Sequence, residues 1–316
     1  MVATHWNKGW IIENDAISIS KFSEITLGRD RSKGNNIWSL DKNKNKPGSV
    51  HYIEVTFNTL RNNWDKEHIG SHIVKNNDIF NCEQTGICGS MGAAFSTIEN
   101  NHIYNIWTKR QFYGFEIGGI KFHAAIDAII RKNHIHNADN GLWLDWMSQG
   151  IRVSSNLFYS NDRDDEFLEV NHGPILIDNN LILSPVRVRN WSEGGAFVHN
   201  LIAGRIEVKK SNRFTPYHLA HTTSIIIIFL LKKNNKFNKS SCYGLKVYKS
   251  TELPNWINNN NNIYYNGATH SKKDINFINY SEYDPKIKLI KKDGKMYLHF
   301  DFDKQYYNHK VKIIST

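Results

Sequence analysis

Three acidic residues stand inside otherwise apolar stretches of the sequence. Glu116 lies in Gly-Phe-Glu-Ile-Gly, Asp145 in Leu-Trp-Leu-Asp-Trp, and Glu169 in Phe-Leu-Glu-Val-Asn. Two carboxyl groups held side by side can divide the work of a hydrolysis. Crowding of like charges keeps one protonated as an acid while the other stays ionised as a nucleophile. A single acidic residue on a solvent-facing strand is usually only a solvated side chain, so the spacing of the three must decide between these explanations.

The elements that position these residues follow an internal repeat. A phrase of the form apolar-x-x-Asn-x-apolar recurs, with 24, 32, 23, 24 and 20 residues between successive asparagines, and a weaker copy ends at Asn14. Short strands that coil once every 20 to 25 residues or so are typical of a parallel β-helix. Recurrent Asn then occupies a turn, where it bonds to the backbone and to the Asn of the next coil. We predict an all-β, right-handed parallel β-helix with a small C-terminal β element. The repeated asparagines are Asn77, Asn101, Asn133, Asn156, Asn180 and Asn200.

The three acidic residues are separated by intervals of about one coil each. Glu116 precedes Asp145 by 29 residues, and Asp145 precedes Glu169 by 24. Equivalent positions on neighbouring strands lie about 4.8 Å apart, and a retaining glycosidase needs two carboxyl groups about 5 to 5.5 Å apart. Strand alternation points Leu142 and Leu144 inward and Asp145 outward. The spacing therefore predicts a stacked pair of carboxylates that cleaves a glycosidic bond.

Aromatic and polar residues surround the predicted column of carboxylates. Trp143 and Trp146 flank Asp145 and are candidates for stacking on a sugar ring, and Asn171 points outward with Glu169. His123 is expected on the outer face near Glu116, and His172 closes the strand of Glu169. For either histidine, a contact to a sugar hydroxyl and a bystander role explain the sequence equally well.

Four further acidic residues follow Asn161, namely Asp162, Asp164, Asp165 and Glu166. A run of charges is usually a solvated turn, and we expect a polar loop here with no part in the chemistry.

Longer motifs now identify a relative. The stretch from Gly141 to Gly150, Gly-Leu-Trp-Leu-Asp-Trp-Met-Ser-Gln-Gly, is followed by Glu-Val-Asn-His-Gly-Pro from Glu169 to Pro174. Together they resemble glycoside hydrolase family 120, whose known members are β-xylosidases, and the resemblance runs from about Gly9 to His221. It implies a β-helix with an associated β-sandwich, retaining chemistry and xylo-oligosaccharide substrates.

The resemblance also implies roles for the three acidic residues. Asp145 would be the nucleophile and Glu169 the acid/base, while Glu116 would hold hydroxyl groups of the sugar in the −1 subsite. The reaction implied needs no metal and no organic cofactor.

The ends of the chain differ from the family pattern. The sequence begins well inside that pattern, so we expect N-terminal coils and part of the sandwich to be missing, and exposed solenoid edges favour a homo-oligomer. We divide the chain into a catalytic β-helix domain (1–212), an irregular segment (213–245), a possible last coil (246–280) and accessory β-strands (281–316). A hairpin is predicted around Lys292-Asp-Gly-Lys295.

Two alternatives stay open. A polysaccharide lyase would need Ca²⁺ held by acidic clusters and a base in the same cleft, for which Lys121 and Arg152 are available. A non-catalytic carbohydrate-binding β-helix would explain why the segment 223–241 does not look like family sequence.

Composition narrows the choice of partners. The formal net charge of +10 over 316 residues admits nucleic acid or a membrane surface, but much of the Lys lies after Lys209 in Lys/Asn-rich stretches instead of on one face. We expect neither nucleic acid nor membrane as a partner. Three cysteines without metal-ligand spacing and no visible signal peptide favour a cytoplasmic location.

Overall fold

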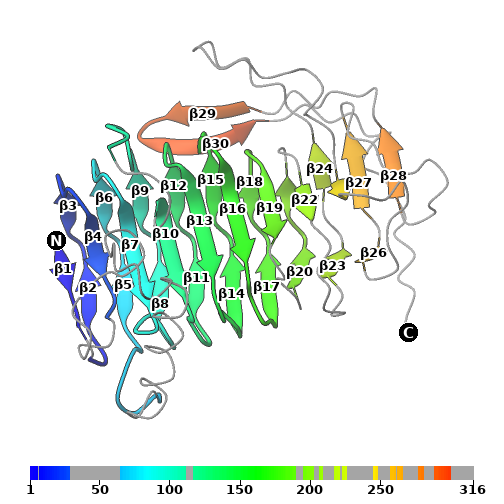
Figure 1. Ribbon diagram of the computed structural model, residues 1–316. Coiled ribbons are helices and arrows are strands. Elements are labelled where there is room, and N and C mark those ends of the chain that lie inside the picture. Colours follow the sequence, from blue (N-terminus) through cyan, green and yellow to red (C-terminus); the bar gives the residue numbers. More distant parts are fainter. Residues whose placement is uncertain are drawn as a thin grey trace.

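The protein forms a right-handed parallel β-helix, as predicted from the repeat. The computed structural model describes residues 1–5, 7–28, 65–111, 117–189, 195–202, 206–208, 217–220, 223–225, 245–247, 257–260, 262–265, 277–280 and 288–299. Within these residues, parallel sheets of nine, nine and ten strands run the length of the molecule, and a two-stranded sheet adds to them. Each coil contributes one strand to each long sheet in turn (Figure 1).

Sheet 1 carries the candidate site. It stacks β1 (Val2–Ala3), β4 (Ser23–Thr26), β7 (Thr85–Ser90), β10 (Gly118–His123), β13 (Asn140–Asp145), β16 (Asp164–Glu169), β19 (Val186–Arg189), β22 (Ile206–Val208) and β25 (Leu245–Val247).

Sheets 2 and 3 complete each coil. Sheet 2 stacks β2 (Ile11–Glu13), β5 (Ile73–Lys75), β8 (Thr97–Glu99), β11 (Ile129–Arg131), β14 (Ile151–Ser154), β17 (Ile175–Asp178), β20 (Gly195–Val198), β23 (Tyr217–Ala220) and β26 (Ile257–Asn260). Sheet 3 stacks β3 (Ala16–Ser18), β6 (Asp78–Phe80), β9 (His102–Tyr104), β12 (His134–His136), β15 (Leu157–Tyr159), β18 (Leu181–Ile182), β21 (Leu201–Ile202), β24 (Thr223–Ile225), β27 (Asn262–Tyr265) and β28 (Phe277–Tyr280).

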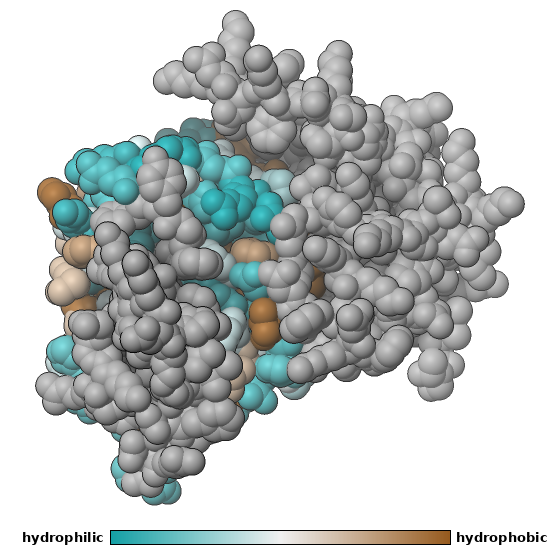
Figure 2. All heavy atoms as spheres, in the orientation of Figure 1, coloured by the Kyte–Doolittle hydropathy of each residue, from teal (hydrophilic) through white to brown (hydrophobic). Residues whose placement is uncertain are grey.

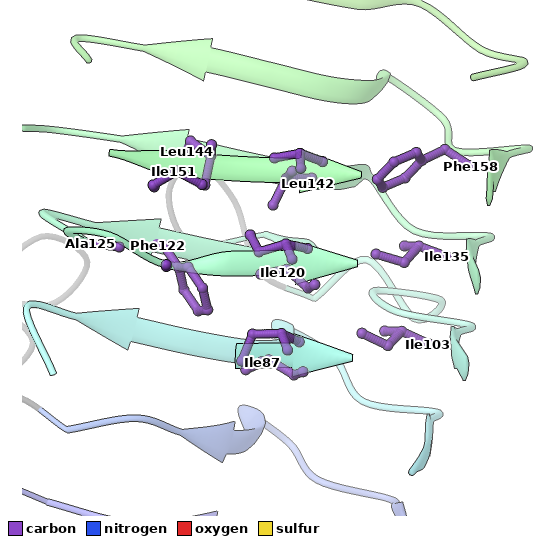
Figure 3. Close-up of a cluster of buried hydrophobic side chains, with 14 of the residues drawn as sticks. Ile87, Ile103, Ile120, Phe122, Ala125, Ile135, Leu142, Leu144, Ile151 and Phe158 are labelled. Carbon is purple, nitrogen blue, oxygen red and sulfur yellow. The ribbon is translucent and has the colours of Figure 1, made fainter. Parts of the chain in front are cut away.

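Columns of apolar side chains fill the interior. In a parallel ladder each side chain lies above the equivalent one of the preceding coil, so one inward position per strand builds a continuous column. On sheet 1, Ile87, Ile120 and Leu142 are fully buried and stack in register. Figure 3 shows these columns meeting Ile103 and Ile135 of sheet 3 inside the coil.

Outward positions alternate with these inward ones and are more polar. On the face seen in Figure 2, the largest area of described residues is hydrophilic, and hydrophobic residues form only small groups. The period-two pattern of the strands therefore separates an apolar interior from a polar surface.

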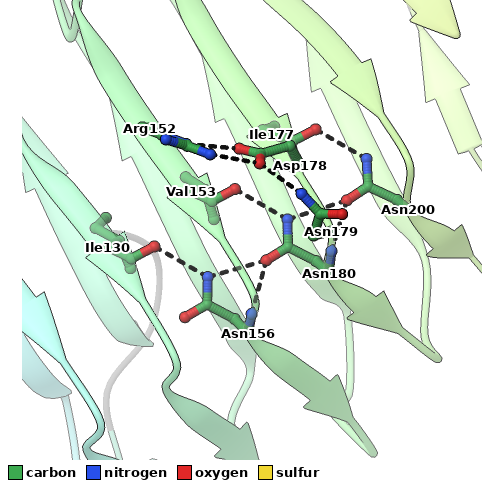
Figure 4. A network of polar contacts seen from close by, with 9 residues as sticks. All are labelled: Ile130, Arg152, Val153, Asn156, Ile177, Asp178, Asn179, Asn180 and Asn200. Carbon is green, nitrogen blue, oxygen red and sulfur yellow. Dashed lines mark hydrogen bonds and ion pairs between the residues drawn. The ribbon is translucent and has the colours of Figure 1, made fainter.

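The repeated asparagines form a buried ladder at the turn between sheets 2 and 3. Nδ2 of Asn156 donates to Oδ1 of Asn180 at 3.0 Å, and Asn180 donates to Asn200 at the same distance (Figure 4). Each Nδ2 also donates to a backbone carbonyl of the preceding coil, as from Asn156 to Ile130 at 3.0 Å. The same pattern links Asn77, Asn101 and Asn133. The predicted role of the repeated Asn is confirmed.

A sharp backbone bend places each ladder asparagine. The residue before it has a φ of 54 to 58°, in the left-handed region that Asn tolerates better than most residues. Three of the six are themselves Asn, which explains the recurrent Asn-Asn pairs in the sequence. The six residues are Asn76, Asn100, Lys132, Ser155, Asn179 and His199.

The three sheets continue beyond residue 212. Strands from β23 to β28 pair in parallel with the preceding coils, where we expected an irregular segment and one possible further coil. The predicted hairpin is present as β29 (Lys288–Lys292) and β30 (Lys295–His299), which pair antiparallel. The division of the chain into domains stays a prediction.

No helix long and apolar enough to cross a membrane is found in the part of the chain that the structure describes.

Candidate active site

Asp145 ends strand β13 on the outer face of sheet 1. Its carboxylate is buried, with the side chain 9% exposed, and Oδ2 accepts a hydrogen bond from Lys121 Nζ at 2.6 Å. The same oxygen lies 3.1 Å from His123 Nε2, while Oδ1 accepts the backbone N–H of Trp146 at 2.7 Å. Three donors from β10 and from the end of β13 therefore hold both oxygens of one carboxylate.

These contacts decide the charge of Asp145. Burial alone would raise the pKa of its carboxyl group, but the charge of Lys121 and the hydrogen bond from His123 outweigh burial and hold that pKa well below its usual range. Asp145 is therefore a carboxylate at neutral pH, the form a nucleophile requires.

Glu169 occupies the equivalent position on the next coil. Leu144 of β13 pairs with Leu168 of β16, so the next residue on each strand, Asp145 and Glu169, continues the same register. Neighbouring strands lie about 4.8 Å apart, so the backbones of the two residues lie about that far apart. Glu169 is half-buried and pairs along the backbone with Arg189 of β19. The structure brings together the two residues that the sequence singled out.

Trp143 lies on the outer face of β13, as alternation predicts, but it is only 4% exposed. Its ring contacts Phe167 with centroids 5.0 Å apart, and Nζ of Lys121 lies 3.1 Å from the centre of the ring. Trp143 therefore fixes the ammonium group that contacts Asp145. Its predicted contact with a sugar ring stays a prediction.

The other predicted residues lie around the same end of sheet 1. Trp146 is half-buried immediately after β13, and its φ of 23° turns the chain there. Asn171 is fully buried and donates from Nδ2 to the carbonyl of Leu144 at 3.1 Å, so it supports the strand of Asp145. His172 is half-buried, and its backbone N–H bonds to the carbonyl of Ser148 at 3.1 Å. Glu116 lies outside the described residues.

His123 and Lys121 both stand on β10, directly beside β13. His123 pairs along the backbone with Asp145, and Lys121 pairs with Trp143. His123 is 4% exposed and contacts Asp145, while its predicted contact with a sugar hydroxyl stays a prediction. The sequence alone indicates Lys121 only as a possible base of a lyase, although its outward position one coil before Trp143 is a signal that places it near Asp145.

The acidic run after Asn161 corrects our expectation of a solvated loop. Asp164, Asp165 and Glu166 lie in strand β16 and are fully buried, and only Asp162 is exposed. Asp164 forms an ion pair with Arg187 at 3.0 Å, and Asp162 forms one with Arg110. The strand does not stand out in the sequence because its charged residues interrupt the apolar alternation that is typical of a strand.

Burial raises the pKa of two of these carboxyl groups. Burial raises the pKa of Asp165 to about 7, although Asn161 Nδ2 and the backbone N–H of Ser184 donate to it at 2.7 and 2.5 Å. Burial, and then the neighbouring Asp165, raise the pKa of Glu166 well above its ordinary value. Glu166 is therefore an uncharged carboxylic acid inside the β-helix.

The coiled sheets and the carboxylate column on the outer face of sheet 1 define a right-handed parallel β-helix protein. Residues 49–203 match the family described as right handed beta helix region. Among solved structures, the complex structure of XylC with xylose shares 36% sequence identity over 99% of this chain, with a TM-score of 0.77. No curated protein matches the chain.

The chain has a β-helix like that of glycoside hydrolase family 120, as its motifs predicted. It spans 56% of the length of XylC.

Proposed function

We propose that the protein is a retaining glycoside hydrolase that releases xylose from β-xylosides or xylo-oligosaccharides. The observation that carries this proposal is the pair of carboxyl residues in register on adjacent coils, one of which is held ionised by Lys121 and His123. The likeness to XylC, whose structure contains xylose, supports the choice of sugar.

The geometry supports a double displacement. Asp145 attacks the anomeric carbon while Glu169 donates its proton to the leaving oxygen, which gives a covalent glycosyl-enzyme and a free alcohol. Glu169, now ionised, removes a proton from water, the water oxygen attacks the anomeric carbon, and Asp145 leaves as a carboxylate. Two inversions give net retention.

The two side chains have environments that suit these separate roles. Asp145 is buried against two basic side chains, which stabilise its negative charge, whereas Glu169 is half-buried and one coil further along. In the proposed mechanism Glu169 supplies the proton that the first step consumes.

The contacts of the two candidate bases argue against a lyase. Lys121 Nζ is buried in its ion pair with Asp145, and Arg152 donates from Nε and Nη2 to the carboxylate of Asp178 at 2.9 and 2.8 Å. Neither group is placed to remove a proton from a sugar carbon.

The test measures hydrolysis of an aryl β-xyloside and of xylobiose by the wild type and by Asp145→Asn, Glu169→Gln and Asp162→Asn. We expect Asp145→Asn to lose activity on both substrates by about 10³-fold or more. Glu169→Gln should lose more on xylobiose than on the aryl xyloside, because a good leaving group needs less protonation. The exposed Asp162→Asn is the matched control and should retain activity.

The stereochemistry of the product completes the test. NMR during the first minutes should show β-xylose before the anomers equilibrate. Initial α-xylose would contradict the retaining mechanism. A folded wild type without turnover on either xyloside would contradict the hydrolase and leave a non-catalytic carbohydrate-binding β-helix.

A further inference from the structure

Three histidines gather on the outer face of sheet 3, away from the carboxylate column. His102 begins β9, and His134 and His136 flank Ile135 on β12, the next strand of the sheet. His102 pairs along the backbone with His134, and Tyr104 pairs with His136. The strand period of two therefore points all three imidazoles out of the same face.

Their nitrogen atoms converge. One ligand atom from each of the three side chains lies within 4.8 Å of the other two. Nε2 of His102 and Nε2 of His136 are 3.0 Å apart, close to the separation of about 3.3 Å that two imidazole ligands adopt on a tetrahedral zinc ion with Zn–N bonds of about 2.0–2.1 Å. All three residues are half-buried.

Second contacts orient two of the rings. Nδ1 of His102 lies 3.0 Å from Oδ1 of Asp78, which leaves its Nε2 facing the cluster. Nε2 of His134 lies 3.1 Å from the hydroxyl group of Tyr159. A carboxylate on the far nitrogen of an imidazole fixes its tautomer and strengthens it as a metal ligand.

Aromatic stacking alone is the competing explanation. Phe80, Tyr104, His136 and Tyr159 form a stacked series across sheet 3, and His102 stacks on His134 with centroids 4.5 Å apart. A stack needs only flat rings, and phenylalanine and tyrosine fill its other positions. A hydrogen bond between Nε2 of His102 and Nε2 of His136 accounts for the approach of these two rings, but not for that of His134 to both.

Burial also sets the charge of two of the rings. Burial lowers the pKa of His134 to about 4 and that of His136 to about 3. Neutral rings offer the lone pairs that a metal needs.

We propose that His102, His134 and His136 bind a divalent transition-metal ion of the zinc type. Three imidazoles leave one position of a tetrahedral ion for water. The parallel rings of His102 and His134 must part for this, because the lone pairs of an imidazole lie in the plane of its ring. This requires the ring of His134 to rotate out of its stack, which also releases its Nε2 from Tyr159.

The position of the cluster gives the ion a structural role. β9 leads into β10, which carries Lys121 and His123, and β12 leads into β13, which carries Asp145. An ion held by both β9 and β12 joins the two coils whose next strands build the charged cluster around Asp145. Binding to the folded state alone raises stability by mass action.

The test titrates ZnCl₂ into chelator-treated, dialysed protein in competition with a chromophoric chelator. We expect one tight zinc ion per chain for the wild type and for His68→Gln, a control whose exposed histidine pairs with Asp65 outside the cluster. His136→Gln and His134→Leu should bind about 100-fold more weakly or not at all, and Asp78→Asn about 10- to 100-fold more weakly. Co²⁺ should give the visible absorption of a tetrahedral nitrogen site in the wild type and in His68→Gln, but not in His136→Gln or His134→Leu.

His134→Leu keeps the test independent of misfolding. The equivalent positions on the next coils are Leu157, Leu181 and Leu201, so leucine suits this column. A melting temperature that rises with zinc in the wild type and not in folded His134→Leu supports the site. Zinc binding that is absent from the wild type, or equal in the wild type and these variants, would overturn it and leave an aromatic stack.

Discussion

At the scale of single residues, Asp145 shows how contacts override burial. A carboxyl group this buried would ordinarily hold its proton, as Glu166 does one coil further on. Asp145 instead meets Lys121, His123 and a backbone N–H, whereas the carboxylate oxygens of Glu166 receive no hydrogen bond from any described residue. The protein therefore keeps one buried carboxyl group charged and another neutral on adjacent strands.

Replacing Lys121 by Met tests how the charge of Asp145 is maintained. Without the ammonium group, the pKa of Asp145 rises toward its ordinary value, so the acidic limb of the kcat/KM profile should move up by about 1 to 3 pH units. The profile is measured on an aryl β-xyloside. Lys75→Met, which removes an exposed ion pair with Glu13, is the control. An unmoved limb in active Lys121→Met would show that Lys121 does not set this pKa.

Replacing Glu166 by Leu tests the buried acid. Glu166 pairs with Leu142 and Val186, which are both core residues, so leucine fits this column. In the unfolded chain this carboxyl group ionises above about pH 4.3, while the fold retains the proton, so the wild type loses stability as pH rises from there toward the raised folded pKa. We expect Glu166→Leu to gain about 1–3 kcal/mol at pH 8 and less at pH 5 by urea unfolding.

Glu166→Gln separates the cost of burying a polar group from the dependence of stability on pH. Glutamine does not ionise but stays polar, so it should remove the dependence on pH and give a smaller gain than leucine. A leucine variant that is less stable than the wild type at every pH would show that the carboxyl group makes a needed contact.

At the scale of elements, the features that repeat on every coil could be predicted from the sequence, and the contacts made on a single coil could not. The Asn ladder was predictable because one amide makes the same hydrogen bonds at the same turn of every coil. The repeat of Asn can still be recognised where a loop is longer. The partners of Asp145 could not be predicted in this way. Lys121, in Gly-Ile-Lys-Phe-His, belongs to no repeat, and only the register of β10 on β13 shows that it lies beside Asp145. The buried acids of β16 broke the apolar pattern that identifies strands, so the sequence placed them in a loop.

The hydrogen bonds of the ladder predict which asparagines contribute most to stability. Nδ2 of Asn133 donates to the carbonyl of Ile98 and to Asn156 at 3.0 and 3.1 Å, and its Oδ1 accepts from Asn101. Asn133→Ala leaves these buried groups without partners and should lower the free energy of unfolding by about 2–4 kcal/mol.

A second row of asparagines provides the control. Asn105 lies in a row with longer side-chain bonds of 3.3 and 3.5 Å, and its φ of 55° suits glycine. Asn105→Gly should change the free energy of unfolding by less than about 1 kcal/mol in the same urea titration. An equal loss of unfolding free energy in Asn133→Ala and Asn105→Gly would mean that the buried row of Asn contributes no more to stability than the second row.

At the scale of the whole molecule, the coil converts distance in sequence into stacking in space. His123, Asp145 and Glu169 lie 22 and 24 residues apart in the sequence and stand in register on three successive strands of one sheet. The same stacking buries an ionisable group wherever side chains of the neighbouring coils cover it. Acid stability should therefore depend on groups far from the candidate site.

His72 provides the clearest case. It is fully buried, its Nδ1 accepts the backbone N–H of Trp10 at 3.1 Å, and burial lowers its pKa to about 4. The unfolded chain protonates this imidazole below about pH 6.5 while the fold keeps it neutral. Its stabilising contribution is therefore complete above pH 6.5 or so and is lost as pH falls toward the folded pKa. His72→Asn retains an acceptor for Trp10 without a titrating group.

Between about pH 7 and pH 4.5, the melting temperature of His72→Asn should consequently fall by a few degrees less than that of the wild type. Scanning calorimetry in the presence of a chelator measures this difference without a contribution from bound metal. His68→Asn, at an exposed histidine, should follow the wild type. If His72→Asn and the wild type lose stability in parallel, the acid sensitivity lies in other groups. The half-buried His134 and His136, whose pKa values are also lowered, would be the next to replace because the sign of their contribution is the same.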